Sequence, residues 1–183
     1  MTKILNLTKK AKEVYEDNKA KGFWGGYDDP KTRISQSTAL IHSEVSEMLE
    51  GHRKGHSVDI NSLTLPSEKH FKKWFEDTIK SSIEDEFADI LIRTLDLAGA
   101  LNLELEVNIE YEKHYLDFYD LVNHLHALCD EIYNNQESPE VPIKVLVSTL
   151  FQSTSYLNTS LYIHMDLKLK YNKLRPYKHG KNY

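Results

Sequence analysis

Hydrophobic residues recur with a helical period over most of this chain. Between about residues 105 and 134 they follow one another at alternating spacings of three and four, in a stripe made by Tyr115, Phe118, Val122, Leu125, Cys129 and Ile132. Such a stripe is typical of a helix that packs lengthwise on other helices. No stretch of any length shows the period of two that marks a half-buried strand. The pattern predicts five helices, at about 3–20, 35–53, 81–98, 105–134 and 143–173.

Capping residues and turn formers set the expected helix boundaries. Ser35 or Ser37 is the expected N-cap of the second helix. Ser81, with Glu84 three residues later, fits a capping box at the start of the third. A polar loop separates these two helices, and within it residues 66–79 are expected to form a short helical piece. We therefore expect an all-α protein, built as an antiparallel helical bundle of about five helices.

Length and composition are those of one ordinary globular domain. The chain has 183 residues, of which 40% are hydrophobic and 28% charged, enough to build a single core. Cys129 is the one cysteine, so no intrachain disulfide can form. The N-terminus has no apolar signal region, and the longest apolar stretches are interrupted by charges. The expectation is a cytoplasmic protein with no membrane partner.

Charge is unevenly distributed along the sequence. The net charge of −5 argues against broad nucleic-acid binding, and none is expected. Residues 166–183, however, contain six Lys or Arg and one acid. This basic segment follows an acidic body and could meet an anionic ligand or another subunit, or could simply be a solvated end.

Two pairs of carboxylates stand out from the other acids. Glu44 and Glu47 lie three residues apart on the second helix, and Glu86 and Asp89 lie three apart on the third. Residues three apart share a helix face, but the same spacing recurs elsewhere in this acidic chain. What distinguishes these pairs is their placement, because Glu44 falls inside an apolar arc. The third helix is apolar on most sides, so its polar seam is expected to be buried.

Buried carboxylates need compensation, since an unpaired one costs several kcal/mol. Arg93 is one remedy, and it suits Asp96 on the same seam. That leaves Glu44, Glu47 and Glu86 without an evident partner. A hard divalent cation such as Mg²⁺ is the other remedy. A di-iron site would need Glu-x-x-His, which does not occur, and the histidines are too scattered for zinc.

The acid-bearing segments resemble a known family. The runs LIHSEVSEMLEG and EDEFADILIRTLDLAG, with the closing segment KLKYNKLRPYKHGK, are similar to the E-x-x-E … E-x-x-D signature and last helix of MazG-like all-α nucleoside triphosphate pyrophosphohydrolases. The resemblance implies hydrolysis of a (deoxy)nucleoside triphosphate to the monophosphate and pyrophosphate, with water attacking the α-phosphorus. It also implies a homodimer or homotetramer, and Mg²⁺, with Mn²⁺ as a substitute, held by Glu44, Glu47, Glu86 and Asp89.

The resemblance further implies roles for individual residues. Either Glu44 or Glu47 would act as the general base. Spacings of four and three put the expected triphosphate ligands on one helix face: Lys168, Asn172 and Arg175.

Two residues outside the motifs have open roles. Trp24, within the sequence GFWGG, would stack on the base or anchor its loop. His42 would line the same cleft or be an ordinary core or surface histidine.

This chain is longer than the short members of the family. We interpret residues 111–165 as an inserted helical hairpin within a single domain that spans 1–183. Two other functions remain open. The chain could be a non-catalytic nucleotide-sensing or partner-binding bundle, or a structural helical module whose acids pair with lysines and arginines.

Overall fold

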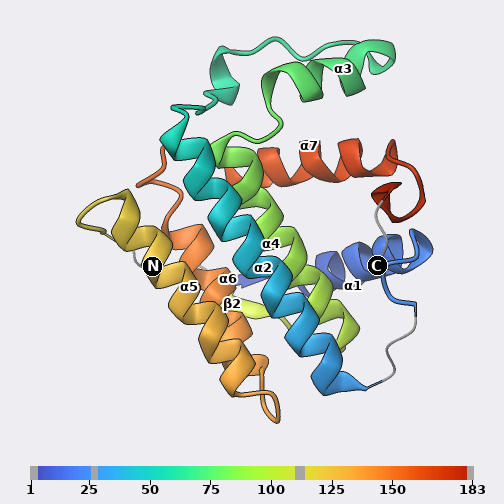
Figure 1. Cartoon of the computed structure of the whole chain (residues 1–183), viewed down its shortest axis with the longest axis vertical. Helices are drawn as coiled ribbons and strands as arrows, with labels where there is room; N and C mark the ends of the chain where they lie inside the picture. Colours follow the sequence, from blue (N-terminus) through green and yellow to red (C-terminus); the bar gives the residue numbers. More distant parts are fainter. Residues whose placement is uncertain (1–3, 26–28, 110–113, 181–183) are drawn as a thin grey trace.

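The computed structural model describes residues 4–25, 29–109 and 114–180, and this part of the chain is mostly helical (Figure 1). Its elements in chain order are the strand β1 (Ile4–Asn6), the helices α1 (Thr8–Ala20) and α2 (Pro30–Arg53), the 3₁₀ turn η1 (Ile60–Ser62), the helices α3 (Glu68–Thr78) and α4 (Ile83–Ala100), the strand β2 (Glu106–Asn108), the helices α5 (Phe118–Asn134), α6 (Glu140–Gln152) and α7 (Leu161–Lys173), and the 3₁₀ turn η2 (Tyr177–Gly180). No helix in these described ranges is both long and apolar enough to cross a membrane.

Helix α4 is the structural centre of the fold. It packs against α1, α2, α6 and α7, while α2 also packs against α5 (Figure 1). Between Ile83 and Ala98 every residue is buried except Asp89, Arg93 and Asp96. These three residues follow at spacings of four and three, so they form one narrow seam on the helix. The sequence prediction of a helix that is apolar on most sides is confirmed.

A close helix crossing explains one glycine. A Cβ added to Gly99 would lie 2.3 Å from the carbonyl oxygen of Ala11 and 2.7 Å from Cβ of Tyr15, both on α1. Only glycine therefore lets α1 approach the end of α4 this closely. The contact places α1 beside the polar seam.

Several predicted boundaries are wrong. α2 begins earlier than Ser35, because Asp29 caps it: its Oδ2 accepts the Thr32 N–H at 2.9 Å, and Pro30 opens the first turn. The cap of α4 is Ser82 rather than Ser81, since Ser82 Oγ accepts the Asp85 N–H at 3.1 Å. Proline at the first helical position was the signal for the earlier start of α2.

The predictions of one continuous helix at 105–134 and another at 143–173 are also wrong. Residues 106–108 form β2, which pairs antiparallel with β1 in the register Leu5↔Val107, and α5 starts only at Phe118. The predicted fifth helix is two helices, α6 and α7, separated by a turn in which Asn158 has a φ of 48°. Such short strands and turns carry too little sequence for a periodicity to show.

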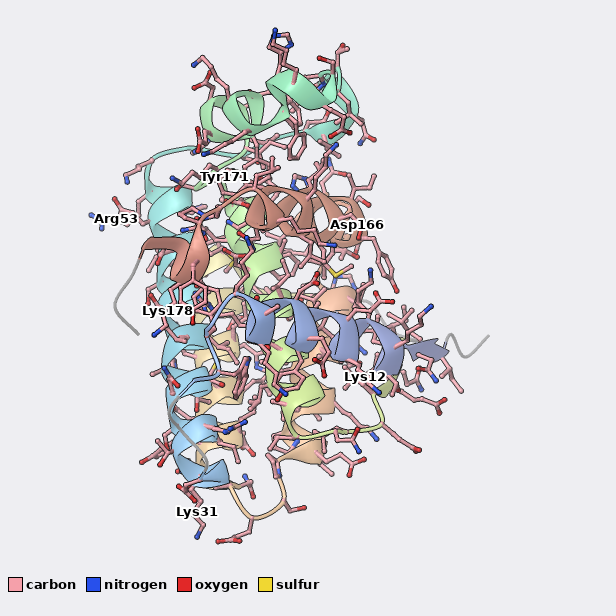
Figure 2. The ribbon with its side chains drawn as sticks, turned by 90° about the vertical axis from the view of Figure 1, so that its right-hand side faces the viewer. Lys12, Lys31, Arg53, Asp166, Tyr171 and Lys178 are labelled. Atoms are coloured by element: carbon pink, nitrogen blue, oxygen red, sulfur yellow. The ribbon has the colours of Figure 1, made fainter. Side chains whose placement is uncertain are left out.

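Two smaller assemblies flank the main core. Helix α3 covers one side of α7 through a second apolar cluster made of Phe71, Phe75, Ile79, Leu167 and Tyr171; Tyr171 lies between the two helices in Figure 2. The segment after α7 is tied to the turn after α1, because Lys178 N–H donates to the Lys21 carbonyl at 2.9 Å (Figure 2). Both contacts fix α7 relative to α4.

Candidate metal centre

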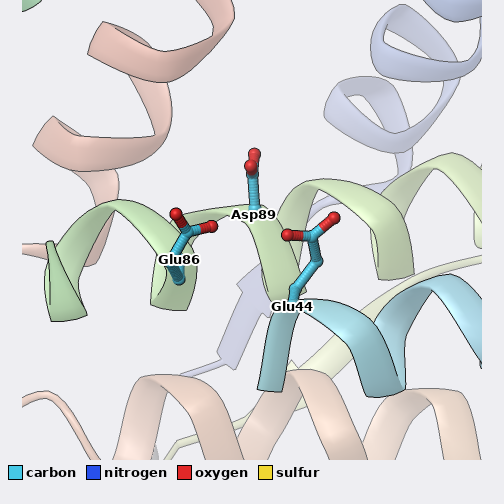
Figure 3. Close-up of side chains that lie close together, drawn as sticks. All are labelled: Glu44, Glu86 and Asp89. Atoms are coloured by element: carbon cyan, nitrogen blue, oxygen red, sulfur yellow. The ribbon is translucent and has the colours of Figure 1, made fainter. Parts of the chain in front are cut away.

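Three carboxylate side chains from two helices converge between α2 and α4 (Figure 3). Glu44 comes from α2, and Glu86 and Asp89 come from consecutive turns of α4. One oxygen of each lies within 4.8 Å of the others. Glu44 and Glu86 are each 4% exposed, whereas Asp89 is partly exposed. The structure thus brings together three of the four acids that the sequence predicts as metal ligands.

Arg93 binds an acid for which the sequence offered no partner. Its Nε lies 2.5 Å from Oε1 of Glu44, across the α2–α4 interface. The inference that Glu44 has no partner is therefore wrong, because helix packing brings Arg93 to it from another element. One oxygen of Glu44 is thus bound by a guanidinium.

Lys168 is the second cation of this region. Its Nζ lies 2.8 Å from Oδ2 of Asp85 and 2.8 Å from Oδ2 of Asp89, and the residue is only 5% exposed. Sequence reasoning missed Asp85, which is 1% exposed and also accepts the Ser81 N–H at 3.0 Å. Its position four residues before Asp89, on the same helix face, is the signal that could have found it.

Negative charge exceeds positive charge among these buried groups. The acid cluster, as we call it, has four members: Glu44, Asp85, Glu86 and Asp89. Within the described part of the chain two cations contact it, Arg93 and Lys168. With all four carboxylates ionised, the cluster would therefore carry an excess of two negative charges. Such an excess is unfavourable in a poorly solvated site, and a single divalent cation would remove it.

The pKa values of the acids reflect this excess. Burial, reinforced by the charges of its carboxylate neighbours and opposed by Lys168, raises the pKa of Glu86 to about 9. Burial likewise raises the pKa of Asp85 to about 6, although Lys168 acts against it. The pKa of Glu44 is raised by burial and by Asp89, and lowered by Arg93. The cluster therefore holds a proton on Glu86 at neutral pH unless another cation replaces it.

The three converging carboxylates fit a hard divalent ion. All three donors are carboxylate oxygens, the ligands that Mg²⁺ takes in proteins. At a metal–oxygen distance of about 2.1 Å, neighbouring ligands of Mg²⁺ stand about 3 Å apart and opposite ones about 4.2 Å apart. The observed oxygens lie within 4.8 Å of one another, so the carboxylates would have to draw closer around an ion. Asp89 is partly exposed, so an ion there would remain accessible from solvent.

A cleft with a volume of about 80 Å³ opens beside Asp89. The walls come from α1, α2, α4, α7 and the segments that follow α1 and α7. Lining residues are Asn18, Phe23, Trp24, Gln36, Ser37, Leu40, Asp89, Ile92, Arg93, Asp96, Asn172 and Arg175. Asp89 and Asp96 are seven residues apart on α4, so the cleft follows that helix for roughly 10 Å. The cleft thus connects Asp89, at the metal centre, with Asp96 about two turns further along α4.

Of the three residues predicted to bind the triphosphate, two line the cleft and Lys168 does not. Asn172 and Arg175 both line the cleft. The Asn172 Oδ1 atom is buried and makes no hydrogen bond within the described part of the chain, which leaves it available to a bound ligand or water. Lys168 is not among the residues lining the cleft. Its ammonium is bound behind the acids, because Asp85 and Asp89 hold it.

At the other end of the cleft, Trp24 is held by hydrogen bonding. Its Nε1–H donates to Oδ1 of Asp96 at 2.9 Å, and the guanidinium carbon of Arg33 lies 5.2 Å from the ring centroid. Burial raises the pKa of Asp96 to about 7, against the hydrogen bonds from Asn18 and Trp24. Trp24 therefore anchors its loop to α4. Its ring also forms part of the cleft wall, so contact with a base remains a prediction.

Glu47 and His42 lie apart from the converging carboxylates. Glu47 is exposed on α2 one turn after Glu44, and it accepts a hydrogen bond from Ser43 Oγ at 3.3 Å. His42 faces α5: its Nδ1 lies 2.8 Å from Nδ1 of His126, and its Nε2 lies 3.3 Å from Oδ1 of Asp130. His42 is not among the residues that line the cleft.

Searches against protein-family models, curated proteins and solved structures find no match to this chain. The geometry of the site is therefore the basis for a functional assignment.

Proposed function

We propose that this protein is a Mg²⁺-dependent nucleoside triphosphate pyrophosphohydrolase. Water would attack the α-phosphorus of a (deoxy)nucleoside triphosphate and release the monophosphate and pyrophosphate. The proposal includes the fold relationship implied by the motifs, an antiparallel helical bundle of the MazG-like kind. A helical pair, α5 and α6, would be added to that bundle, and the protein would assemble as a homodimer or homotetramer.

One observation carries the proposal: Asp89 belongs to a cluster in which carboxylates outnumber the cations that contact them, and it also lines a cleft that contains Arg175 and Asn172. A purely structural cluster would be expected to balance its own charge. A guanidinium and an unpartnered amide oxygen beside the acids fit the recognition of a phosphorylated, hydrogen-bonding ligand. The combination favours a metal-assisted reaction of a phosphoanhydride.

The proposal assigns a role to each residue of the site. Glu44, Glu86 and Asp89 would hold the ion, which would neutralise phosphate charge and lower the pKa of a bound water. Arg175 would bind phosphate oxygens through its planar guanidinium. Either Glu44 or Glu47 would act as the base: Glu44 lies at the convergence point but is bound to Arg93, and Glu47 is exposed one turn further along α2.

The test is a panel of dNTPs and NTPs incubated with and without Mg²⁺, with pyrophosphate measured. We expect pyrophosphate from at least one nucleotide, and only with the metal. Glu86→Gln should lower the rate by more than the roughly 10–100-fold that loss of an outer metal partner costs. Glu50→Gln is the matched control, since Glu50 is a partly exposed acid on α2 that pairs with Arg53 and Lys54 away from the cluster.

No pyrophosphate from any nucleotide would refute the enzymatic proposal. Thermal stabilisation by a nucleotide without turnover would instead support the nucleotide-sensing alternative.

A further inference from the structure

Lys168 is a buried cation with two acidic ligands. Its Nζ is bound at 2.8 Å by one oxygen of Asp85 and one oxygen of Asp89. On its third side lies the ring of Phe75, with the centroid 5.8 Å from Nζ. Asp89 therefore has two neighbours on its carboxylate: the ammonium of Lys168 and the convergence point that it shares with Glu44 and Glu86.

Packing fixes the ammonium in this position. The Phe75 ring stacks on Tyr171 with centroids 4.5 Å apart, and the Tyr171 hydroxyl donates to Oε1 of Glu76 at 3.0 Å. These contacts lock α3 onto α7 around Lys168. The ammonium itself is held by its ion pairs with Asp85 and Asp89. The charge is thus a permanent part of the acid cluster rather than a mobile ligand for phosphate.

The position of Lys168 resembles that of a metal in a two-metal site. Two ions in such a site stand about 3.5–4 Å apart and share a bridging carboxylate. Here Asp89 would be the shared carboxylate, and Asp85 would be the further ligand of the second cation. The ammonium already occupies that place.

Charge balance favours the same conclusion. The four members of the acid cluster contact Arg93 and Lys168, which leaves two negative charges once a bound ion has displaced the proton of Glu86. One divalent ion makes the set neutral, whereas two would leave it with two positive charges before any substrate arrives.

We infer that Lys168 is a built-in cation that replaces a second metal ion, so that the acid cluster binds one divalent ion per chain in the absence of nucleotide. The inference rests on the metal site of the proposed function and adds its stoichiometry. Lys168 is then a positioning residue for Asp89, and it makes no contact with substrate.

The test is titration of the whole protein with Mn²⁺ alone, with free Mn²⁺ measured by electron paramagnetic resonance. The wild-type protein should bind one Mn²⁺ per chain at the cluster. Lys168→Arg keeps the charge and should also bind one. Lys168→Met removes the ammonium and should bind two. The matched control is Lys170→Met, which breaks the α7–α3 ion pair with Glu68, 2.6 Å long, away from the cluster; it should bind one.

Two Mn²⁺ ions per wild-type chain would overturn the inference, and so would a folded Lys168→Met variant that still binds one. If circular dichroism shows that Lys168→Met is unfolded, the wild-type and Lys168→Arg stoichiometries decide the question. Absence of Mn²⁺ binding to the wild-type protein would overturn the metal site itself. If the wild-type protein binds two ions and still releases pyrophosphate in a metal-dependent way, only the role of Lys168 is overturned and the proposed function stands.

Discussion

Glu86 makes the stability of the metal-free protein depend on pH in an unusual direction. Burial raises the pKa of Glu86 from an ordinary 4.5 to about 9. Between these values the folded protein keeps a proton that the unfolded chain releases. Stability contributed by that proton is complete below about pH 4.5 and is lost as the pH rises towards 9. Metal-free protein should therefore become less stable on going from pH 6 to pH 8.

The magnitude follows from proton linkage. A single group that differs by one proton between the two states changes the free energy of unfolding by about 1.4 kcal/mol per pH unit. Between pH 6 and 8 the limit for Glu86 is therefore about 3 kcal/mol, and coupling to the neighbouring acids would reduce it to roughly 1–3 kcal/mol. Glu86→Gln removes the titrating group but keeps its size, so this variant should lose less stability over the same range.

The assay is urea unfolding in EDTA, followed by circular dichroism at pH 6 and pH 8. The comparison of interest is the difference between wild type and Glu86→Gln, because Asp96 and other groups also titrate in this range. Glu50→Gln serves as the partly exposed control. Equal pH dependence in all three proteins would refute the reasoning, since it would show that Glu86 ionises at its ordinary pKa in the folded state.

Three further changes test other parts of the structure. Arg93→Met should destabilise the metal-free protein by about 3–5 kcal/mol, because Glu44 loses its partner. In a thermal unfolding assay, added Mg²⁺ should restore part of this stability. A variant with the same unfolding midpoint as the wild type would show that the ion pair contributes little. Gly22→Ala places a Cβ 2.1 Å from the Tyr177 ring at a φ of +84°, so we expect a loss of about 1–3 kcal/mol and faster proteolysis of the C-terminal segment; resistance equal to that of wild type would contradict this contact. Arg175→Lys should weaken nucleotide binding about 10-fold through loss of bidentate contacts, measured by calorimetry in the presence of Mg²⁺, and equal affinity would remove Arg175 from the site.

The sequence was sufficient to predict the helical character and the heart of the candidate site. The narrow seam of α4 is readable because most of the helix is apolar: Asp89 lies on the seam, and Glu86 lies three residues before it on the same face. Glu44 was found from its place inside an apolar arc, and it is indeed buried. These features depend on local periodicity, which a single sequence contains.

Partners across elements could not be predicted in the same way. Arg93 pairs with Glu44 from another helix, and Lys168 reaches Asp85 from a residue 83 positions away in the chain. Such pairings depend on how the helices cross, and helical period does not determine the crossing. The same limit explains His42, whose pairing with His126 on α5 depends on which face of α2 meets that helix.

The short strands were missed for a different reason. β1 and β2 contain three residues each, too few for alternation to be distinguished from helical spacing. Their pairing joins the start of the chain to the segment after α4, a contact between positions about a hundred residues apart.

The position of bond cleavage tests the central claim most directly. A nucleoside triphosphate that the protein hydrolyses is incubated with it in H₂¹⁸O, and both products are analysed by mass spectrometry. The product that carries ¹⁸O identifies the phosphorus that water attacks. We predict Mg²⁺-dependent formation of the monophosphate and pyrophosphate, with ¹⁸O in the monophosphate only. Label in pyrophosphate, release of inorganic phosphate with a diphosphate, or no metal-dependent hydrolysis of any nucleotide would contradict the assignment.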